Sequence, residues 1–146
     1  MIKILGTCFF LALAAQNLPA QGFVQISSLR VHPPKLVCVG ADAIGRVRVQ
    51  VYAAGLSQAA KRSTVTVELA LYSAHPGESK LNIRDASQEI SLADSPAVVD
   101  FEISCNADTL PGEIALGATI STAPDGVQIK EPERQPVVRV LLERPK

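Results

Sequence analysis

The 146-residue sequence contains no tryptophan, and its aromatic side chains are few, with two tyrosines and four phenylalanines. Without tryptophan, the chain cannot place a buried indole behind a disulfide between two sheets, as antibody domains do. Charge of one sign is also missing, because 14 basic and 14 acidic side chains cancel to a net charge of zero. A neutral chain offers no broad electrostatic attraction, so we expect neither nucleic acid nor an anionic membrane surface as a partner.

Recognisable catalytic and metal-binding motifs are missing as well. The sequence has no His-Glu-x-x-His, no Gly-x-Ser-x-Gly, no glycine-rich phosphate loop and no calcium-loop spacing of aspartates. His32 and His75 each lie beside a proline in a predicted turn, where a solvated side chain is the expected role. We therefore expect no enzyme, metal site or cofactor. Folding can still bring Asp100, Glu102 or Glu113 close to another acid, so a small secreted ligand-binding or hydrolytic protein stays an open alternative.

The N-terminus has the pattern of a secretory signal peptide. Lys3 supplies a positive charge, and the apolar run from Ile4 to Ala15 follows it. A membrane-spanning helix needs roughly 20 apolar residues, so this run is too short to be a stable membrane anchor. We expect cleavage after Ala20, so that residues 1–20 are the signal peptide and residues 21–146 form a single domain. The protein is then exported, to the periplasm or to the extracellular space.

Cysteine usage agrees with export. Removing residues 1–20 removes Cys8 and leaves Cys38 and Cys105, an even number in an oxidising compartment. A disulfide between them is the expected state, and two buried free thiols are the alternative. A metal site is not expected, because neither cysteine has a second ligand nearby in the sequence. Closing a loop of this length is expected to stabilise the fold by roughly 4 kcal/mol on the chain-entropy model.

Alternation of apolar and polar residues is the main structural signal in residues 21–146. In Ala97–Cys105, one phase is apolar (Val99, Phe101, Ile103, Cys105) and the other is polar, which is typical of a strand with one buried face. Similar patterns predict further strands at Phe23–Val31, Leu36–Val39, Arg46–Tyr52, Thr64–Tyr72, Ile114–Ile120 and Val137–Leu142. Weaker signals lie at Leu81–Ile83, Ile90–Leu92 and Val127–Ile129, the last predicted to extend a hairpin. Ala53–Arg62 is small and polar and is predicted to be a loop, with one helical turn within it as the alternative.

About seven short strands separated by turns predict an all-β fold, an antiparallel immunoglobulin-like β-sandwich. The first strand changes phase near Ser27–Ser28, so we expect a bulge or a crossing between sheets there. In such a sandwich the second and fifth strands are antiparallel neighbours. Cys38 then lies near the start of one and Cys105 at the end of the other, which predicts a bridge within or beside one sheet.

The sequence resembles the bacterial cell-adhesion-related (CARDB) domains from Ile26 to about Leu142. The matching features are Ile26–Val31 followed by prolines, Val39-Gly40, Gly55, the Thr64–Tyr72 strand, Val99-Asp-Phe101 before Pro111-Gly112, and Thr122–Asp125 before Glu131 and Glu133. Two signatures differ, because Ala53-Ala54 replaces the usual Asn before Gly55, and Glu131–Gln135 replaces a Glu-x-Asn-Asn sequence. The resemblance implies an exported immunoglobulin-like module of bacterial adhesion or envelope assembly, with no catalytic residues.

The expected function is therefore protein–protein interaction by a non-enzymatic exported module. Two candidate interface patches follow from the strand patterns: the second apolar face of the last strand (Val137, Leu141), and a polar face that carries Arg46, Arg48 and Tyr52 beside Glu68 and Tyr72. Burial of the apolar face and an ordinary charged sheet surface are the respective alternatives. A subunit that self-assembles by adding a strand through its first or last strand is a further alternative.

Overall fold

The computed structural model describes residues 22–40, 43–72 and 81–145, so the predicted signal peptide and the His75 turn lie outside the described residues. The described residues form ten strands and one short helix. Their bounds are β1 Phe23–His32, β2 Lys35–Val37, β3 Ala43–Ala54, α2 Gln58–Lys61, β4 Thr64–Leu71, β5 Asn82–Arg84, β6 Ser87–Ser91, β7 Ala97–Cys105, β8 Gly112–Thr122, β9 Gln128–Ile129 and β10 Val137–Glu143.

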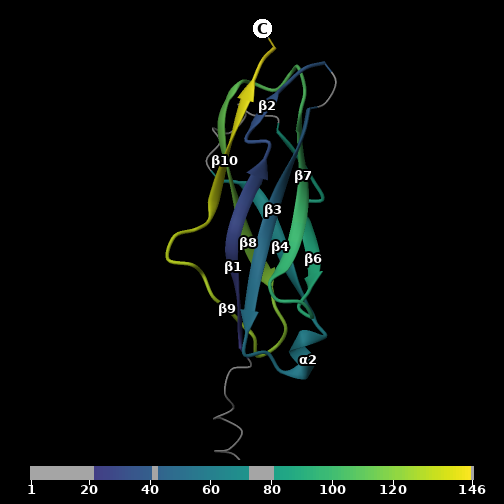
Figure 1. The fold of residues 1–146 in the computed structure, drawn as a ribbon, viewed down its shortest axis with the longest axis vertical. Helices are drawn as coiled ribbons and strands as arrows, with labels where there is room; N and C mark the ends of the chain where they lie inside the picture. Colours follow the sequence, from purple (N-terminus) through teal and green to yellow (C-terminus); the bar gives the residue numbers. More distant parts are fainter. Residues whose placement is uncertain (1–21, 41–42, 73–80, 146) are drawn as a thin grey trace, which may run out of the picture.

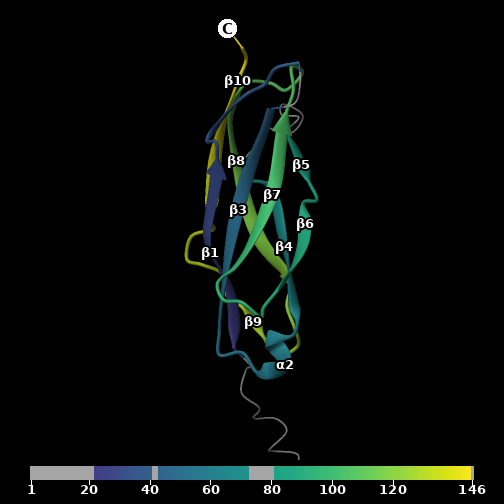
Figure 2. The same ribbon diagram turned by 45° about the vertical axis from the view of Figure 1, so that its right-hand side comes forward.

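The strands form two five-stranded sheets that pack face to face in an elongated sandwich (Figures 1 and 2). Sheet A has the order β5-β7-β3-β1-β9, and sheet B has the order β2-β10-β8-β4-β6. The order β1-β3-β7-β5 is the A-B-E-D order of an immunoglobulin domain, and β4-β8-β10 is its C-F-G order. The predicted immunoglobulin-like β-sandwich is therefore confirmed by the topology.

The core lies between the sheets and is built by the alternation seen in the sequence. Val47, Val49 and Phe101 of sheet A are 0% exposed, and so are Val67 and Leu116 of sheet B. Successive side chains of a strand point to opposite faces, so every second residue enters the core and the intervening polar residues face solvent. The central strands β3 and β7 thus present a row of charged and polar side chains on the outer face of sheet A.

Strand β1 contains the predicted bulge, and the chain crosses to the other sheet after β1 ends. Its pairing with β3 shifts between Ile26 and Ser28, which confirms the bulge at Ser27. The crossing itself comes later, at Pro33-Pro34, after which β2 pairs in parallel with β10 in sheet B. The Cys38 N–H continues this pairing by donating to the Glu143 carbonyl at 2.7 Å.

The disulfide links Cys38 to Cys105 as predicted, with Cα atoms 5.3 Å apart. Its position corrects the expectation of a bridge within or beside one sheet. Cys105 ends β7 in sheet A, whereas Cys38 follows β2 in sheet B, so the bridge joins the two sheets at one end of the sandwich. The reason is the crossing at the two prolines, which moves the chain to sheet B before it reaches Cys38.

The count of about seven strands is too low for the described residues, because the weak signals at Leu81–Ile83, Ile90–Leu92 and Val127–Ile129 correspond to three further short strands, β5, β6 and β9. The segment at Val127–Ile129 also pairs differently from the prediction. Instead of extending a hairpin from β8, β9 runs parallel to β1 at the edge of sheet A. The helical turn predicted within Ala53–Arg62 is present as α2, where the Ser57 hydroxyl caps the helix by accepting from the Ala60 N–H at 3.1 Å.

Candidate interaction surface

The outer face of sheet A carries basic side chains that oppose one another across the β1–β3 pair. Arg30 lies opposite Arg48, and His32 lies opposite Arg46. Directly opposed residues of antiparallel strands have Cβ atoms about 4.5–5.5 Å apart, and like charges at that distance destabilise the pair. This arrangement therefore raises the energy of the sheet unless negative charge lies nearby.

Strand β7 supplies part of that negative charge. Asp100 accepts two hydrogen bonds from Arg48, from Nε at 2.9 Å and from Nη2 at 3.1 Å. The hydrogen bond from Arg48 holds the pKa of Asp100 below its ordinary value, against an opposing effect of burial and with added attraction from Arg48 and Arg46. The same hydrogen bond raises the pKa of Arg48. Glu102 lies opposite Arg46 but pairs with Arg84 of β5, at 3.9 Å.

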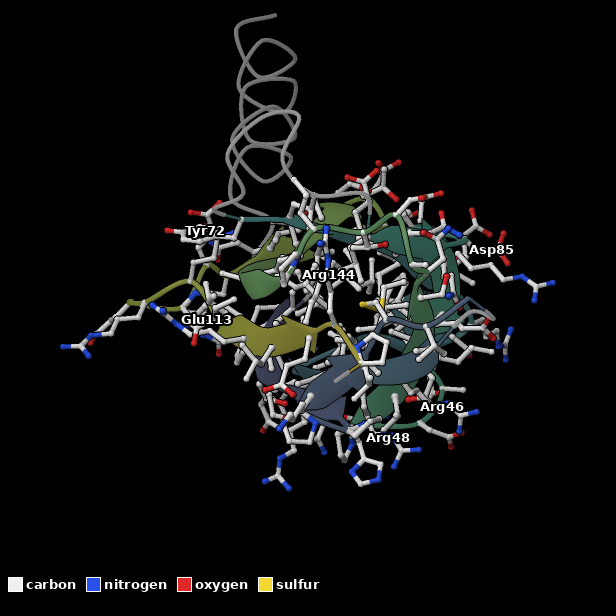
Figure 3. All side chains as sticks on the ribbon, turned by 90° about the horizontal axis from the view of Figure 1, so that it is seen from above. Arg46, Arg48, Tyr72, Asp85, Glu113 and Arg144 are labelled. Carbon is white, nitrogen blue, oxygen red and sulfur yellow. A yellow bond between two sulfur atoms is a disulfide. The ribbon has the colours of Figure 1, made fainter. Side chains whose placement is uncertain are left out.

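Two arginines of this face are left without a carboxylate. Within residues 22–40, 43–72 and 81–145, neither Arg30 nor Arg46 has an acidic oxygen within ion-pair distance. Figure 3 shows Arg46 and Arg48 projecting together from one side of the sandwich. Arg30 and Arg46 therefore form no ion pair within the described residues, although Asp100 attracts Arg46 at longer range.

An open groove of about 540 Å³ runs over these residues. Its lining is Arg30, Val31, His32, Pro33, Ile44, Gly45, Arg46, Arg48 and Glu102. Ile44 is 59% exposed at one side of the groove, so an apolar side chain lies directly beside the basic ones. Arginine next to exposed apolar surface is a composition typical of protein interfaces.

The opposite end of the same face is aromatic. The Tyr52 ring lies 6.1 Å from the Phe23 ring, and Lys130 Nζ lies 4.3 Å from the centroid of the Phe23 ring. Tyr52 remains 45% exposed. The outer face of sheet A therefore carries Arg46, Arg48 and Tyr52 together, as the alternation of β3 requires.

Tyr72 and Glu68 do not lie beside these residues, which corrects that part of the prediction. Glu68 lies in β4 and Tyr72 directly follows that strand, and β4 lies in sheet B whereas β3 lies in sheet A. Figure 3 places Tyr72 on a different side of the molecule from Arg46 and Arg48. Alternation within a strand indicates which residues share a face, but it contains no information about which sheet the strand joins.

The last strand does not present a continuous apolar stripe. Leu141 is 39% exposed and Val137 is half-buried, and Arg139 lies between them. Arg139 Nη1 donates to Glu113 Oε1 at 2.6 Å, while Lys35 pairs with Glu143 at 3.0 Å on the other side of Leu141. Leu141 is thus a single apolar side chain among ion pairs, and isolated surface leucines are ordinary.

Arg30 was not singled out by the sequence, although its position could be read there. The first strand has Leu29 and Val31 in its apolar phase beyond the bulge, which puts Arg30 and His32 on the polar face. Their juxtaposition with β3 depends on the strand register, which the sequence alone does not indicate. In the part of the chain that the structure describes, no group of three or more metal-ligating side chains is formed. The helix among these residues is neither long nor apolar enough to cross a membrane.

The chain matches no family model and no curated protein. Among solved structures, it is similar to the apo form of the Calx CBD1 domain, with 14% identity, a TM-score of 0.46, and coverage of 85% of this chain and 99% of that one. It is also similar to a two-domain protein of unknown function from Bacteroides fragilis, at 10% identity, a TM-score of 0.49, and 92% and 49% coverage. A Caenorhabditis elegans MSP family member has 13% identity, a TM-score of 0.41, and 82% and 99% coverage. Because these scores lie below 0.5, the fold is assigned from the strand order, and no role is transferred from these proteins.

Proposed function

We propose that the chain is an exported, non-enzymatic immunoglobulin-like module that acts by protein–protein contact through the outer face of sheet A. The observation that carries this proposal is the pair Arg30 and Arg46, neither of which has a carboxylate within ion-pair distance among the described residues. Arg30 faces Arg48 across the strands, and Arg46 lies between His32 and Glu102. An acidic segment of a partner supplies negative charge beside Arg30 and Arg46 and weakens the repulsion between Arg30 and Arg48.

The spacing of the two arginines favours an extended acidic segment. Arg30 lies opposite Arg48, so Arg30 and Arg46 are diagonal neighbours. Diagonal neighbours in an antiparallel pair are about 7–8 Å apart. Side chains two residues apart on an extended chain lie about 6.6–6.8 Å apart on the same face. Acidic residues at alternate positions of a partner segment therefore match the two arginines.

A polyanionic surface fits this face less well than a short acidic segment. The chain has a net charge of zero and a pI of about 6.7. Membrane attraction typically uses clusters of about 4–8 basic residues, and nucleic-acid binding uses many phosphate contacts. Here Asp100 and Glu102 lie next to the arginines and would repel the continuous charge of such a surface.

The resemblance to CARDB domains supports a role in bacterial adhesion or envelope assembly, and the predicted signal peptide supports export. Intact-mass spectrometry of the protein from its producing cell tests the export step. A mass that starts at Gln21 and is two hydrogens short of the reduced chain agrees with export and with the Cys38–Cys105 bridge. A mass that includes residues 1–20 contradicts export, and a mass that shows two free thiols contradicts the bridge.

Charge reversal tests the contact surface. Immobilised residues 21–146 are used to capture partners from the envelope fraction, and the wild type is compared with the Arg30→Glu/Arg46→Glu variant. The control is Arg134→Glu/Arg144→Glu, which makes the same change of charge at exposed arginines outside sheet A. We expect the first variant alone to lose the captured partner. Equal capture by the two variants would refute the role of this face. A thermal shift with a metal ion or a small ligand would instead favour the ligand-binding alternative.

A further inference from the structure

The edge of sheet A next to the basic face is partly open. Strand β9 borders β1 only at Phe23 and Val24. Strand β9 is the last strand on this side of sheet A. Beyond Val24, therefore, no strand of the described residues pairs with this side of β1. We call the segment Ile26–Val31 the β1 edge.

Proline explains why β9 stops there. The Gln128 N–H donates to the Gly22 carbonyl at 3.0 Å, and the Lys130 N–H donates to the Val24 carbonyl at 2.9 Å. At the same spacing, the next donor is residue 132 and the next acceptor is the Ile26 carbonyl. Residue 132 is a proline and has no N–H, so the ladder cannot continue. The chain then leaves the sheet in the loop between β9 and β10, which stands out from the sandwich in Figures 1 and 2.

Hydrogen bonds on the far side of the sheet show which way the backbone of β1 points. Gln88 Nε2 donates to the Asp100 carbonyl at 3.1 Å, so this carbonyl points away from β3. Arg48 lies opposite Asp100, and its backbone groups must therefore point to β1. Arg30 is the partner of Arg48 there, so its own N–H and C=O point to β3.

Because backbone groups alternate along a strand, the neighbours of Arg30 point the other way. Leu29 and Val31 thus direct their N–H and C=O groups to the open edge, where no other strand of the described residues pairs with them. Their side chains are half-buried and pack against the core, as does the side chain of Val138 in β10 of sheet B. The edge therefore combines free backbone donors and acceptors with apolar surface that is only partly covered.

A hollow of about 130 Å³ lies beside Ile26, at the end of the β1 edge that is next to β9. Ile26, Ala118, Ile120, Ile129 and Pro132 are among its lining residues. An apolar cavity of about 150 Å³ in another protein holds a benzene molecule, so this hollow has room for one branched aliphatic side chain. A residue paired with the β1 edge points to the same face as its β1 neighbour, so every second side chain of an added strand points between the sheets.

We propose that the β1 edge binds an extended segment of the partner by strand addition, with aliphatic side chains turned inward and acidic side chains turned outward beside Arg30. This inference rests on the proposed function, because the outward side chains are the acidic ones that the basic face attracts. The projecting loop hinders the approach of another sandwich edge to edge, whereas a single strand needs a width of only about 4.8 Å.

Amide hydrogen exchange with a synthetic peptide of alternating valine and glutamate tests this proposal. In the free protein, the Leu29 and Val31 amides are expected to exchange quickly, whereas the Arg30 amide is protected by β3. Saturating peptide is expected to slow exchange at Leu29 and Val31 at least tenfold. The same peptide with N-methyl groups at alternate positions cannot form the ladder and should give no protection. Slow exchange at Leu29 and Val31 in the free protein, or equal protection by both peptides, would overturn the proposal.

A closing variant gives a second test. In Pro132→Val, residue 132 regains an N–H and can donate to the Ile26 carbonyl, so β9 lengthens along β1. We expect peptide affinity to fall at least tenfold, while Pro124→Val, in a turn away from the edge, leaves it unchanged. Unchanged affinity in Pro132→Val would contradict strand addition.

The outcomes separate this inference from the proposed function. Charge-dependent binding without protection of the edge amides keeps the basic face as the docking site and refutes strand addition. A peptide of alternating valine and threonine is the control for charge. If it protects the edge amides as strongly as the glutamate peptide does, strand addition at the β1 edge is supported and the acidic nature of the partner is refuted. Protection that rises with protein concentration alone overturns the peptide model in favour of pairing between two copies of the chain.

Discussion

Loss of the Cys38–Cys105 bridge is expected to lower the free energy of unfolding by about 4 kcal/mol. The two cysteines are separated by 67 residues, so the bridge strongly restricts the unfolded chain. The chain-entropy relation for a loop of this length gives about 4 kcal/mol at 25 °C. The bridge also ties sheet A to sheet B at the end where β2 contributes only three residues to the ladder. The reduced protein is thus expected to remain folded but with a much smaller free energy of unfolding.

Equilibrium urea denaturation measures this effect. With an m-value of about 1.5 kcal/mol/M, the loss corresponds to a urea midpoint lower by roughly 3 M. Because Cys38 and Cys105 are 1% and 3% exposed, the Cys38→Ala/Cys105→Ala variant also loses packing. The wild type in reducing buffer keeps both sulfur atoms and so isolates the effect of the bond. A difference below about 1 kcal/mol between oxidised and reduced wild type would refute the entropic reasoning, since loops this long are expected to give several times more.

Three further predictions concern the core, the backbone and the ion pair. Phe101 is 0% exposed, so Phe101→Ala should cost about 3–5 kcal/mol by urea denaturation, whereas the control Val98→Ala, at 49% exposure, should stay within about 0.5 kcal/mol. Gly22 has φ +97° and its Cβ would overlap the backbone at the end of β3, so Gly22→Ala should cost about 1–3 kcal/mol; Gly40→Ala, which meets nothing within 4 Å, should be nearly neutral. Asp100 has a lowered pKa in the folded state, so its contribution is present above the unfolded pKa and is lost as pH falls through the folded value. The stability difference between wild type and Asp100→Asn should therefore shrink on acidification, and a difference that persists at acid pH would contradict this.

The long strands were predictable because their alternation is a local property of the chain. The pattern at Ala97–Cys105 predicts β7 with the bounds that the structure has. The cysteine pairing was predictable from the count of two cysteines in residues 21–146. The pairing of β9 with β1 was not, because it depends on two residues of Gln128–Ile129 and on where β1 lies in space.

The candidate surface was predictable only in part, for the same reason. Strand alternation puts Arg46, Arg48 and Tyr52 on one face, and the structure places them on the outer face of sheet A. Tyr72 follows β4 of the other sheet, and the position of Arg30 beside Arg48 on this face depends on the register between β1 and β3. A strand register is determined by long-range packing, so the sequence contains no local signal for it.

The most direct test of the proposed docking face is site-specific photo-crosslinking in the producing cell. A photoreactive side chain replaces His32, which is exposed on the basic face beside Arg30, and a matched variant carries it at Arg144, which is exposed after β10. We expect one prominent cross-linked protein partner from position 32 and none from position 144, with the product reduced by Arg46→Glu. The same products from both positions, or none from position 32, would contradict a partner bound at the outer face of sheet A.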